Sequence, residues 1–261
     1  MMPVRLGAVE YLNARPLVYG LDRDAHFAVR YDVPSECARL LHTGDIDLGL
    51  IPSIEYLRGG PYRIVPGVSI ASDGPVASVA LYTRKSIDAV RSIALDTSSR
   101  TSIALVQVLC ARHFKIAPSI EHHLPDLASM LARCDAALII GDVALLLDAE
   151  PGVTKIDLGD VWKRMTGLPF VYAFWAGRPD AVSADGVRAL QAARDAGVQR
   201  PGEVARTYFA DAPEHHEVGA RYLRDNIKYQ LGDAERAGLE AFYRYAAEAG
   251  VVTGAGRVDF Y

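Results

Sequence analysis

A run of hydroxyl side chains next to one arginine is the stretch of this sequence best suited to chemistry: Thr97-Ser98-Ser99-Arg100-Thr101-Ser102. An apolar segment, Ser92 to Leu95, precedes it, and apolar residues at helical spacing follow it. Free amides and hydroxyls at a helix start, beside a guanidinium, can bind a carboxylate or a phosphate. Capping by Ser98 or Ser99 would explain part of the run. Because five hydroxyl-bearing residues in six positions exceed the needs of a cap, we expect an anion site formed by Ser99, Arg100, Thr101 and Ser102.

Asn13 and Arg15 follow the first apolar segment, Val4 to Val9, within the stretch Tyr11 to Leu17. Asn13 can donate and accept hydrogen bonds without carrying charge, so it suits a reacting centre at the edge of a sheet. Capping of a helix that has Pro16 in its first turn is the alternative role for Asn13. Arg15 is either a second anion-binding residue or a solvated surface charge.

Ser78 lies in an apolar run from Val76 to Tyr82, after the turn signal Asp73-Gly74-Pro75. On a strand it would share a face with Val76 and Ala80, so its hydroxyl would be buried and would need a partner. A ligand or a neighbouring carbonyl could be that partner.

Two stretches share one pattern, in which a short apolar strand ends in a small or polar turn before a helix. The first leads through Gly44-Asp45-Ile46-Asp47 to Ser53, and the second leads from Cys134 to Gly141-Asp142. Open α/β sheets bind ligands at such strand ends, although two stretches of an α/β protein can also share this pattern by chance. From the pattern alone, both explanations stay open for the turns that carry Ser53, Gly141 and Asp142.

Short apolar runs alternate with helical patterns along most of the chain, which predicts βαβ units around mostly parallel sheets. Pro75 to Tyr82 and Pro169 to Trp175 are long β-like runs that flank a middle segment. If both cross between lobes, residues 1–82 and 177–261 form one lobe, and residues 83–176 form a second, inserted lobe. A cleft between lobes joined by two strands can close on a ligand through a hinge. Beyond Pro179 the pattern is helical, and we expect this tail to complete the first lobe.

The composition excludes several classes of protein. Half of the 261 residues are hydrophobic, 23% are charged, and the formal net charge is −4, so no general positive field would attract nucleic acid. The N-terminus lacks the apolar run of a secretory signal, no stretch approaches bilayer length, and three scattered cysteines suit a reducing cytoplasm. Without metal-binding, nucleotide-binding or hydrolase motifs, neither a metal nor an organic cofactor is expected. A homo-oligomer is compatible with the sequence, although nothing in it indicates one.

Several motifs in order resemble those of the chorismate dehydratases, the MqnA family that acts in menaquinone biosynthesis by the futalosine pathway. They are G-x-V-x-Y-L-N from Gly7, G-D-I-D-L-G-L-I-P from Gly44, S-D-G-P from Ser72, T-S-S-R-T-S from Thr97, I-G-D from Ile140 and D-L-G-x-x-W-K-x-x-T-G-L-P-F-V from Asp157. The resemblance covers residues 4 to 176, whereas the helical tail agrees only in general character.

The resemblance implies the two-lobed, type II periplasmic-binding-protein-like fold, which agrees with the hinge inferred above. It also implies loss of water from chorismate to give 3-[(1-carboxyvinyl)oxy]benzoate, without a cofactor. Asn13 and Ser78 match positions beside the ring or the enolpyruvyl ether, and the Ser99 to Ser102 segment matches an anion site. Arg15, Ser53 and Gly141-Asp142 would complete the contacts with the substrate.

The matched segments contain no His, Cys or Lys that could remove the ring proton, and Asp142 would repel a dianion. We therefore expect substrate-assisted catalysis, in which the enolpyruvyl carboxylate takes the proton while Asn13 and Ser78 hold the reactive conformer. A non-catalytic protein of the same fold that binds or senses a small carboxylate is the alternative. A third hypothesis is a later enzyme of the same pathway with the same fold. Such an enzyme would be expected to present a catalytic histidine in the cleft, and the matched segments contain none.

Overall fold

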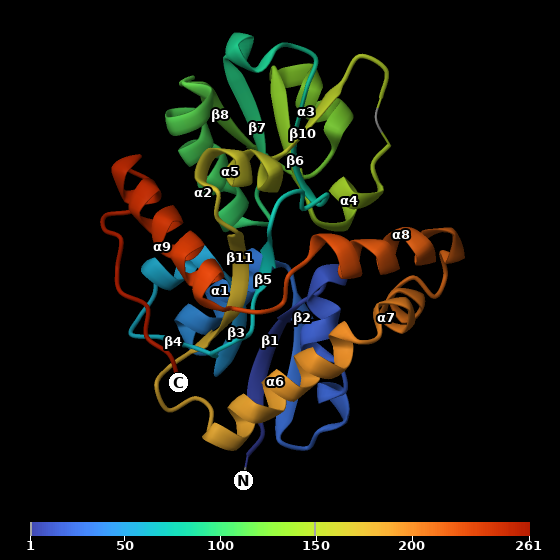
Figure 1. Ribbon diagram of the computed structural model, residues 1–261, viewed down its shortest axis with the longest axis vertical. Coiled ribbons are helices and arrows are strands. Elements are labelled where there is room, and N and C mark those ends of the chain that lie inside the picture. Colours follow the sequence, from blue (N-terminus) through green and yellow to red (C-terminus); the bar gives the residue numbers. More distant parts are fainter. Residues whose placement is uncertain (1, 149) are drawn as a thin grey trace.

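The computed structural model describes residues 2–148 and 150–261 and contains two sheets, each with its own helices, stacked along the long axis of the molecule (Figure 1). In the first sheet the strand order is β2-β1-β3-β11-β4, with β5 paired to β11, and in the second it is β10-β6-β9-β7-β8. We call the two halves the first and the second lobe. The predicted two-lobed α/β architecture is therefore confirmed.

The first sheet consists of β1 (Val4–Val9), β2 (Phe27–Asp32), β3 (Leu48–Pro52), β4 (Arg63–Ile64), β5 (Ile70–Ser72) and β11 (Phe170–Gly177). The second consists of β6 (Val79–Thr83), β7 (Ser92–Asp96), β8 (Ser119–His123), β9 (Ala136–Ile140) and β10 (Thr154–Asp157). Strand β1 is parallel to β2 and β3, and β7 is parallel to β8 and β9. By contrast, β11 runs antiparallel to β3, and β6 antiparallel to β9. Each sheet thus has three parallel strands on one side and antiparallel pairs on the other.

Nine α-helices lie in the described part of the chain: α1 (Pro34–Thr43), α2 (Arg100–Leu109), α3 (Leu127–Arg133), α4 (Gly141–Leu146), α5 (Leu158–Thr166), α6 (Ala184–Val198), α7 (Pro201–Tyr208), α8 (His216–Arg221) and α9 (Asp233–Glu248). Shorter helical turns include η1 (Leu12–Val18), η3 (Ser53–Leu57) and the π-helical turn η7 (Tyr222–Asn226). Between residues 2–148 and 150–261, no helix combines the length and the hydrophobicity needed to cross a bilayer.

The chain crosses between the lobes in the short segments before β6 and before β11. Strand β6 belongs entirely to the second sheet and β11 entirely to the first, whereas the predicted boundaries, 82/83 and 176/177, lie one strand later. The apolar runs from Pro75 and Pro169 predict strands correctly, but hydrophobicity alone does not tell which sheet a strand joins. Both crossing segments nevertheless lie between the lobes.

The helical tail does more than cover the first lobe. Helix α6 packs on η1, while α9 contacts both β11 in the first lobe and α2 in the second. After α8, the chain crosses the molecule at the level where the lobes meet (Figure 1). The tail therefore reaches the junction between the lobes, which the sequence did not indicate.

Packing of α6 against η1 requires a glycine at position 197. A Cβ atom there would lie 2.3 Å from the carbonyl oxygen of Pro16, far inside van der Waals contact. Since η1 also carries Asn13, this close approach fixes the turn on which a candidate site residue lies.

We expect Gly197→Ala to lower the free energy of unfolding by about 1–3 kcal/mol, because the new methyl group must push α6 away from Pro16. Gly202→Ala, in the neighbouring helix α7, is the control: its Cβ would meet only the end of the flexible Arg206 side chain, and alanine favours helix. Urea unfolding curves of both variants measure the effect. Equal stability of Gly197→Ala and the unmodified protein would contradict this account of the packing.

Candidate functional site

A narrow cavity lies at the junction of the two lobes and is lined by residues of both. Tyr11 and Asn13 come from the first lobe, Ser99, Ser102 and Gly141 come from the second, and Ser78 precedes β6 at a crossing. The volume of this cavity that water could occupy is about 50 Å³. The lobes are therefore closed over this central cavity, and a ligand of substrate size needs them to part.

Ser78 lies in the wall of the central cavity at the end of a strained turn. The preceding Ala77 has a φ of 66°, in the left-handed region that residues other than glycine seldom adopt. Asp157 holds this turn, since its carboxylate accepts hydrogen bonds from the amides of Val76 and Ala77, at 3.1 and 2.7 Å. The Ser78 hydroxyl is buried, 2.6 Å from the hydroxyl of Tyr222. Its protein partner is a phenol rather than the carbonyl that the sequence suggested.

Asn13 lies on η1 and lines the central cavity, but it does not cap η1. Tyr11 occupies the N-cap position and makes no side-chain capping bond. The side-chain oxygen of Asn13 is buried and accepts no hydrogen bond from the described residues. Because a buried acceptor without a donor is costly, this oxygen is a ready partner for a ligand hydroxyl.

Helix α2 begins at the wall of the central cavity. Ser99 caps it by accepting a hydrogen bond from the amide of Ser102, and the two hydroxyls lie 3.0 Å apart. The amides of the first helical turn have no carbonyl of their own helix to bond, so they favour a negative group nearby. The structure thus brings Ser99 and Ser102 of the predicted anion site to the cavity.

Arg100, Thr101 and Ser53 do not line the central cavity but join the lobes beside it. Thr101 accepts a hydrogen bond from the amide of Ile54, at 3.2 Å, and its hydroxyl lies 3.4 Å from that of Ser53. Ser53 also donates to the carbonyl of Val171, at 2.8 Å. Both hydroxyls are therefore occupied by protein partners, which gives Thr101 a role in the hydroxyl run other than binding an anion.

Arg100 is paired with a buried carboxylate of the other lobe. Its guanidinium lies 2.7 Å from Glu55 on η3, whose side chain is 1% exposed. His42 and Arg58 bind the same carboxylate, at 3.1 and 2.9 Å. Burial alone would raise the pKa of Glu55, but hydrogen bonds from His42 and Arg58, together with Arg100, lower it below its ordinary value. We call this cluster of Glu55, His42, Arg58 and Arg100 the Glu55 clasp.

Gly141 and Asp142 begin α4, but only Gly141 lines the central cavity. Its φ is 68°, and its amide donates to the carbonyl of Ser78, at 2.8 Å. The Asp142 carboxylate instead accepts hydrogen bonds from the amide of Leu12, at 3.2 Å, and from the hydroxyl of Tyr208, at 2.5 Å. Burial raises the pKa of Asp142 above its ordinary value, although these hydrogen bonds act to lower it. Asp142 therefore ties η1 of the first lobe to the second lobe.

Arg15 points away from the central cavity, into hollows on the other side of η1. Its guanidinium donates to the carbonyl of Glu10, at 2.8 Å, and lies 4.3 Å and 5.1 Å from the ring centres of Tyr31 and Tyr208. Stacking between these rings holds Arg15 away from Asn13 and Ser78. In this closed arrangement it does not join them.

No Lys, Arg or His of the described chain lines the central cavity. Its polar groups are neutral, and within residues 2–148 and 150–261 no cluster of His, Cys, Asp and Glu has the arrangement of a metal site. An anion bound there would meet hydroxyls, an amide and the start of α2.

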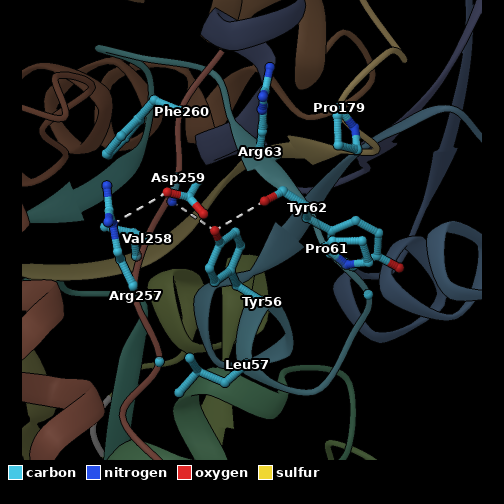
Figure 2. A pocket seen from close by; sticks show the side chains of 12 residues that line it. Tyr56, Leu57, Pro61, Tyr62, Arg63, Pro179, Arg257, Val258, Asp259 and Phe260 are labelled. Carbon is cyan, nitrogen blue, oxygen red and sulfur yellow. Dashed lines mark hydrogen bonds and ion pairs between the residues drawn. The ribbon is translucent and has the colours of Figure 1, made fainter.

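A second, wider hollow of about 710 Å³ lies on the first lobe beside the C-terminal segment (Figure 2). Tyr56 organises it, since its hydroxyl donates to the carbonyl of Tyr62, at 3.1 Å, and accepts from the amide of Asp259, at 2.8 Å. It shares no lining residue with the central cavity.

The chain resembles known enzymes over nearly its whole length. Residues 4–248 match a family model described as "Menaquinone biosynthesis". A chorismate dehydratase of Thermus thermophilus is 34% identical over 264 residues, which cover 93% of this chain and 94% of that protein. A chorismate dehydratase of Campylobacter jejuni is 30% identical over 174 residues, 64% of either chain.

Solved structures agree with the fold. A protein of Archaeoglobus fulgidus superposes with a TM-score of 0.77 at 16% identity, covering 96% of this chain and 99% of its own. The alkanesulfonate-binding protein SsuA of Xanthomonas axonopodis, bound to MOPS, superposes with a TM-score of 0.64 at 17% identity, covering 94% and 93%. The predicted periplasmic-binding-protein-like fold is therefore confirmed.

We expect Glu55→Gln to lower the free energy of unfolding by about 2–3 kcal/mol at pH 7, because it removes the buried charge to which His42, Arg58 and Arg100 bind. A carboxyl whose pKa is lower in the folded protein stabilises it above the unfolded value and loses this effect as the pH falls through the folded pKa. The difference in free energy of unfolding between Glu55→Gln and the unmodified protein should therefore become smaller as the pH falls towards 4. Urea unfolding at several pH values measures it.

The control for this prediction is Glu36→Gln, which breaks an exposed pair with Arg39 and should leave stability nearly unchanged. A stability loss for Glu55→Gln that stayed constant from pH 7 to strongly acidic pH would contradict the role assigned to the charge of Glu55.

Proposed function

The chain belongs to the menaquinone biosynthesis family, and we propose that it is a chorismate dehydratase, which removes water from chorismate to give 3-[(1-carboxyvinyl)oxy]benzoate. The observation that carries this function is the 34% identity to the Thermus enzyme of that name across 93% of the chain. The central cavity adds a chemical reason, because it offers neutral hydrogen-bonding groups to a substrate that brings its own two carboxylates.

The absence of a cation from the described cavity wall favours the substrate as its own base. An arginine paired with a carboxylate lowers its pKa and makes it a weaker base, whereas burial among neutral groups raises the pKa. A carboxylate with a raised pKa removes a proton more effectively near neutral pH. Catalysis thus needs the enolpyruvyl carboxylate to lie where Arg15 and Arg100 cannot pair with it.

The enolpyruvyl carboxylate takes the proton from the ring carbon that bears the ether, and the C–H electron pair becomes a ring double bond. The bond from the neighbouring carbon to the hydroxyl breaks, and the proton taken by the carboxylate passes to the leaving hydroxide, which becomes water and restores the carboxylate. Formation of an aromatic ring drives the step, and the enzyme supplies position and a dry, polar environment.

Asn13 and Ser78 are the residues proposed to act on the departing hydroxyl. The unpartnered side-chain oxygen of Asn13 can accept a hydrogen bond from this hydroxyl and so fix its orientation. The Ser78 hydroxyl can donate to the same oxygen as negative charge develops on it. Ser99, Ser102 and the first amides of α2 would receive the ring carboxylate, and Gly141 would form the floor beside them.

The remaining predicted site residues act indirectly in this proposal. Arg100, Thr101, Ser53 and Asp142 hold the lobes closed around the substrate. Arg15 stabilises η1 and does not contact the substrate. A cytoplasmic location and independence from cofactors stay predictions of the sequence.

A binding or sensing protein is the second candidate, because the structural relatives include a sulfonate-binding protein of the same fold. Such a protein would hold the carboxylates in the same cavity without breaking a bond.

Incubation of the protein with chorismate in the presence of a chelator should yield a product lighter by one water, followed by ultraviolet absorbance and mass spectrometry. Multiple turnovers support the dehydratase function and its independence from metal. Stoichiometric binding with chorismate recovered unchanged would favour the binding protein instead.

Asn13→Ala should lower kcat by about a hundredfold or more with a small change in KM, because its contact matters mainly in the transition state. Asp142→Asn should lower kcat only severalfold, because its amide oxygen still accepts one of the two hydrogen bonds that tie the lobes. Steady-state kinetics of both variants measure the contrast. Loss of turnover in Asp142→Asn with intact chorismate binding would identify Asp142 as the base and overturn substrate assistance.

A further inference from the structure

Tyr222, in the tail whose role the sequence left open, lies directly behind Ser78. Its side chain comes from η7, where the chain after α8 crosses at the level of the lobe junction (Figure 1). The two hydroxyl oxygens are 2.6 Å apart, and both residues are buried. Ser78 lines the central cavity, whereas Tyr222 does not. The phenol therefore contacts a reaction residue from the side away from the substrate.

The direction of this hydrogen bond decides what Ser78 can offer to the cavity. A serine hydroxyl has one proton and can accept through its lone pairs. If Ser78 donates to Tyr222, only lone pairs face the cavity. If Tyr222 donates to Ser78, the serine proton is free to point at a ligand.

The surroundings of Tyr222 keep its proton in place. Burial raises the pKa of Tyr222 far above its ordinary value, and the opposing effects of Ser78 and Asn13 offset only part of the shift. The phenol is thus neutral throughout the working pH range and always has a proton to donate. The side-chain oxygen of Asn13, which has no hydrogen-bond partner among the described residues, is available to accept from a ligand in the same cavity.

We propose that Tyr222 is a positioning residue that donates its hydrogen bond to Ser78 and thereby turns the single Ser78 proton toward the central cavity. This inference rests on the proposed dehydratase function, because a departing hydroxide needs a donor and gains nothing from a serine that presents lone pairs. Tyr222 does not touch the substrate itself. It prepares the donor before the substrate arrives, so no rotation of the serine is needed during the reaction.

Tyr222→Phe tests this role by removing one oxygen atom and leaving the ring in place. We expect kcat to fall by about tenfold to a hundredfold while KM changes less than about threefold, because the lost interaction acts on the leaving group. Tyr229→Phe is the matched control. Tyr229 lies in the same segment, and its buried hydroxyl has no hydrogen-bond partner among the described residues, so its removal should leave kcat unchanged.

A double-mutant cycle shows whether Tyr222 acts through Ser78. In the Ser78→Ala background, Tyr222→Phe should cause no further loss of kcat, because the group that it orients is already gone. An equal fold-loss in both backgrounds would overturn the inference. So would a Tyr222→Phe variant whose kcat matches that of Tyr229→Phe.

Failure of the proposed function is distinguishable from failure of this inference. If the unmodified protein binds chorismate without turning it over, the dehydratase function fails, and the inference is then decided by calorimetric affinity. A donor aimed at the ligand predicts that Tyr222→Phe weakens chorismate binding about tenfold, while Tyr229→Phe does not. Equal affinity of the two variants would overturn it.

Discussion

The closed arrangement of this protein depends on the need of buried and partly buried carboxylates for hydrogen-bond donors. Glu55, Asp142 and Asp157 surround the central cavity, and none of them lines it. Glu55 binds Arg100 across the lobe junction, Asp142 binds the Leu12 amide across it, and Asp157 binds the amides of a crossing segment. A carboxylate removed from water is costly unless such donors are in place. Closure satisfies Glu55 and Asp142, and Asp157 fixes the crossing segment, so all three charges stabilise the geometry of the cavity from outside it.

This placement separates two electrostatic tasks. Negative charges of the protein lie behind the walls, where hydrogen-bond donors stabilise them, and the positive charges of Arg15 and Arg100 are engaged with protein groups. A dianionic ligand therefore meets dipoles, and its carboxylates keep their basicity. In the proposed reaction, a periplasmic-binding-protein-like fold would thus support an elimination in two ways: it keeps cationic side chains away from the substrate, and it offers the substrate neutral hydrogen-bonding groups.

The sequence predicted the two lobes and brought forward Asn13, Ser78, Ser99, Ser102 and Gly141, which line the central cavity, because strand ends and helix starts follow from local pattern. It did not distinguish Arg100 from its neighbours, since successive residues of a first helical turn point in different directions. Glu55 could have been suspected, because it is one acid within the apolar stretch Ile51 to Leu57 and would have to be paired there. No feature of the sequence indicated a role for Tyr222. Its contact with Ser78 joins residues 144 positions apart, which only the tertiary structure reveals.

The insertion of one lobe into the other also orders the assembly of the chain. Strands β6 to β10 lie in one continuous stretch, so the second sheet can form from neighbouring segments. The first sheet pairs β3 with β11, which is separated from it by that whole lobe. During synthesis the second lobe is complete while the first still lacks an inner strand, and β11 must then join between strands already made. The central cavity is lined by residues of both lobes and backed by Tyr222 of the tail, so it can be completed only after these segments have joined.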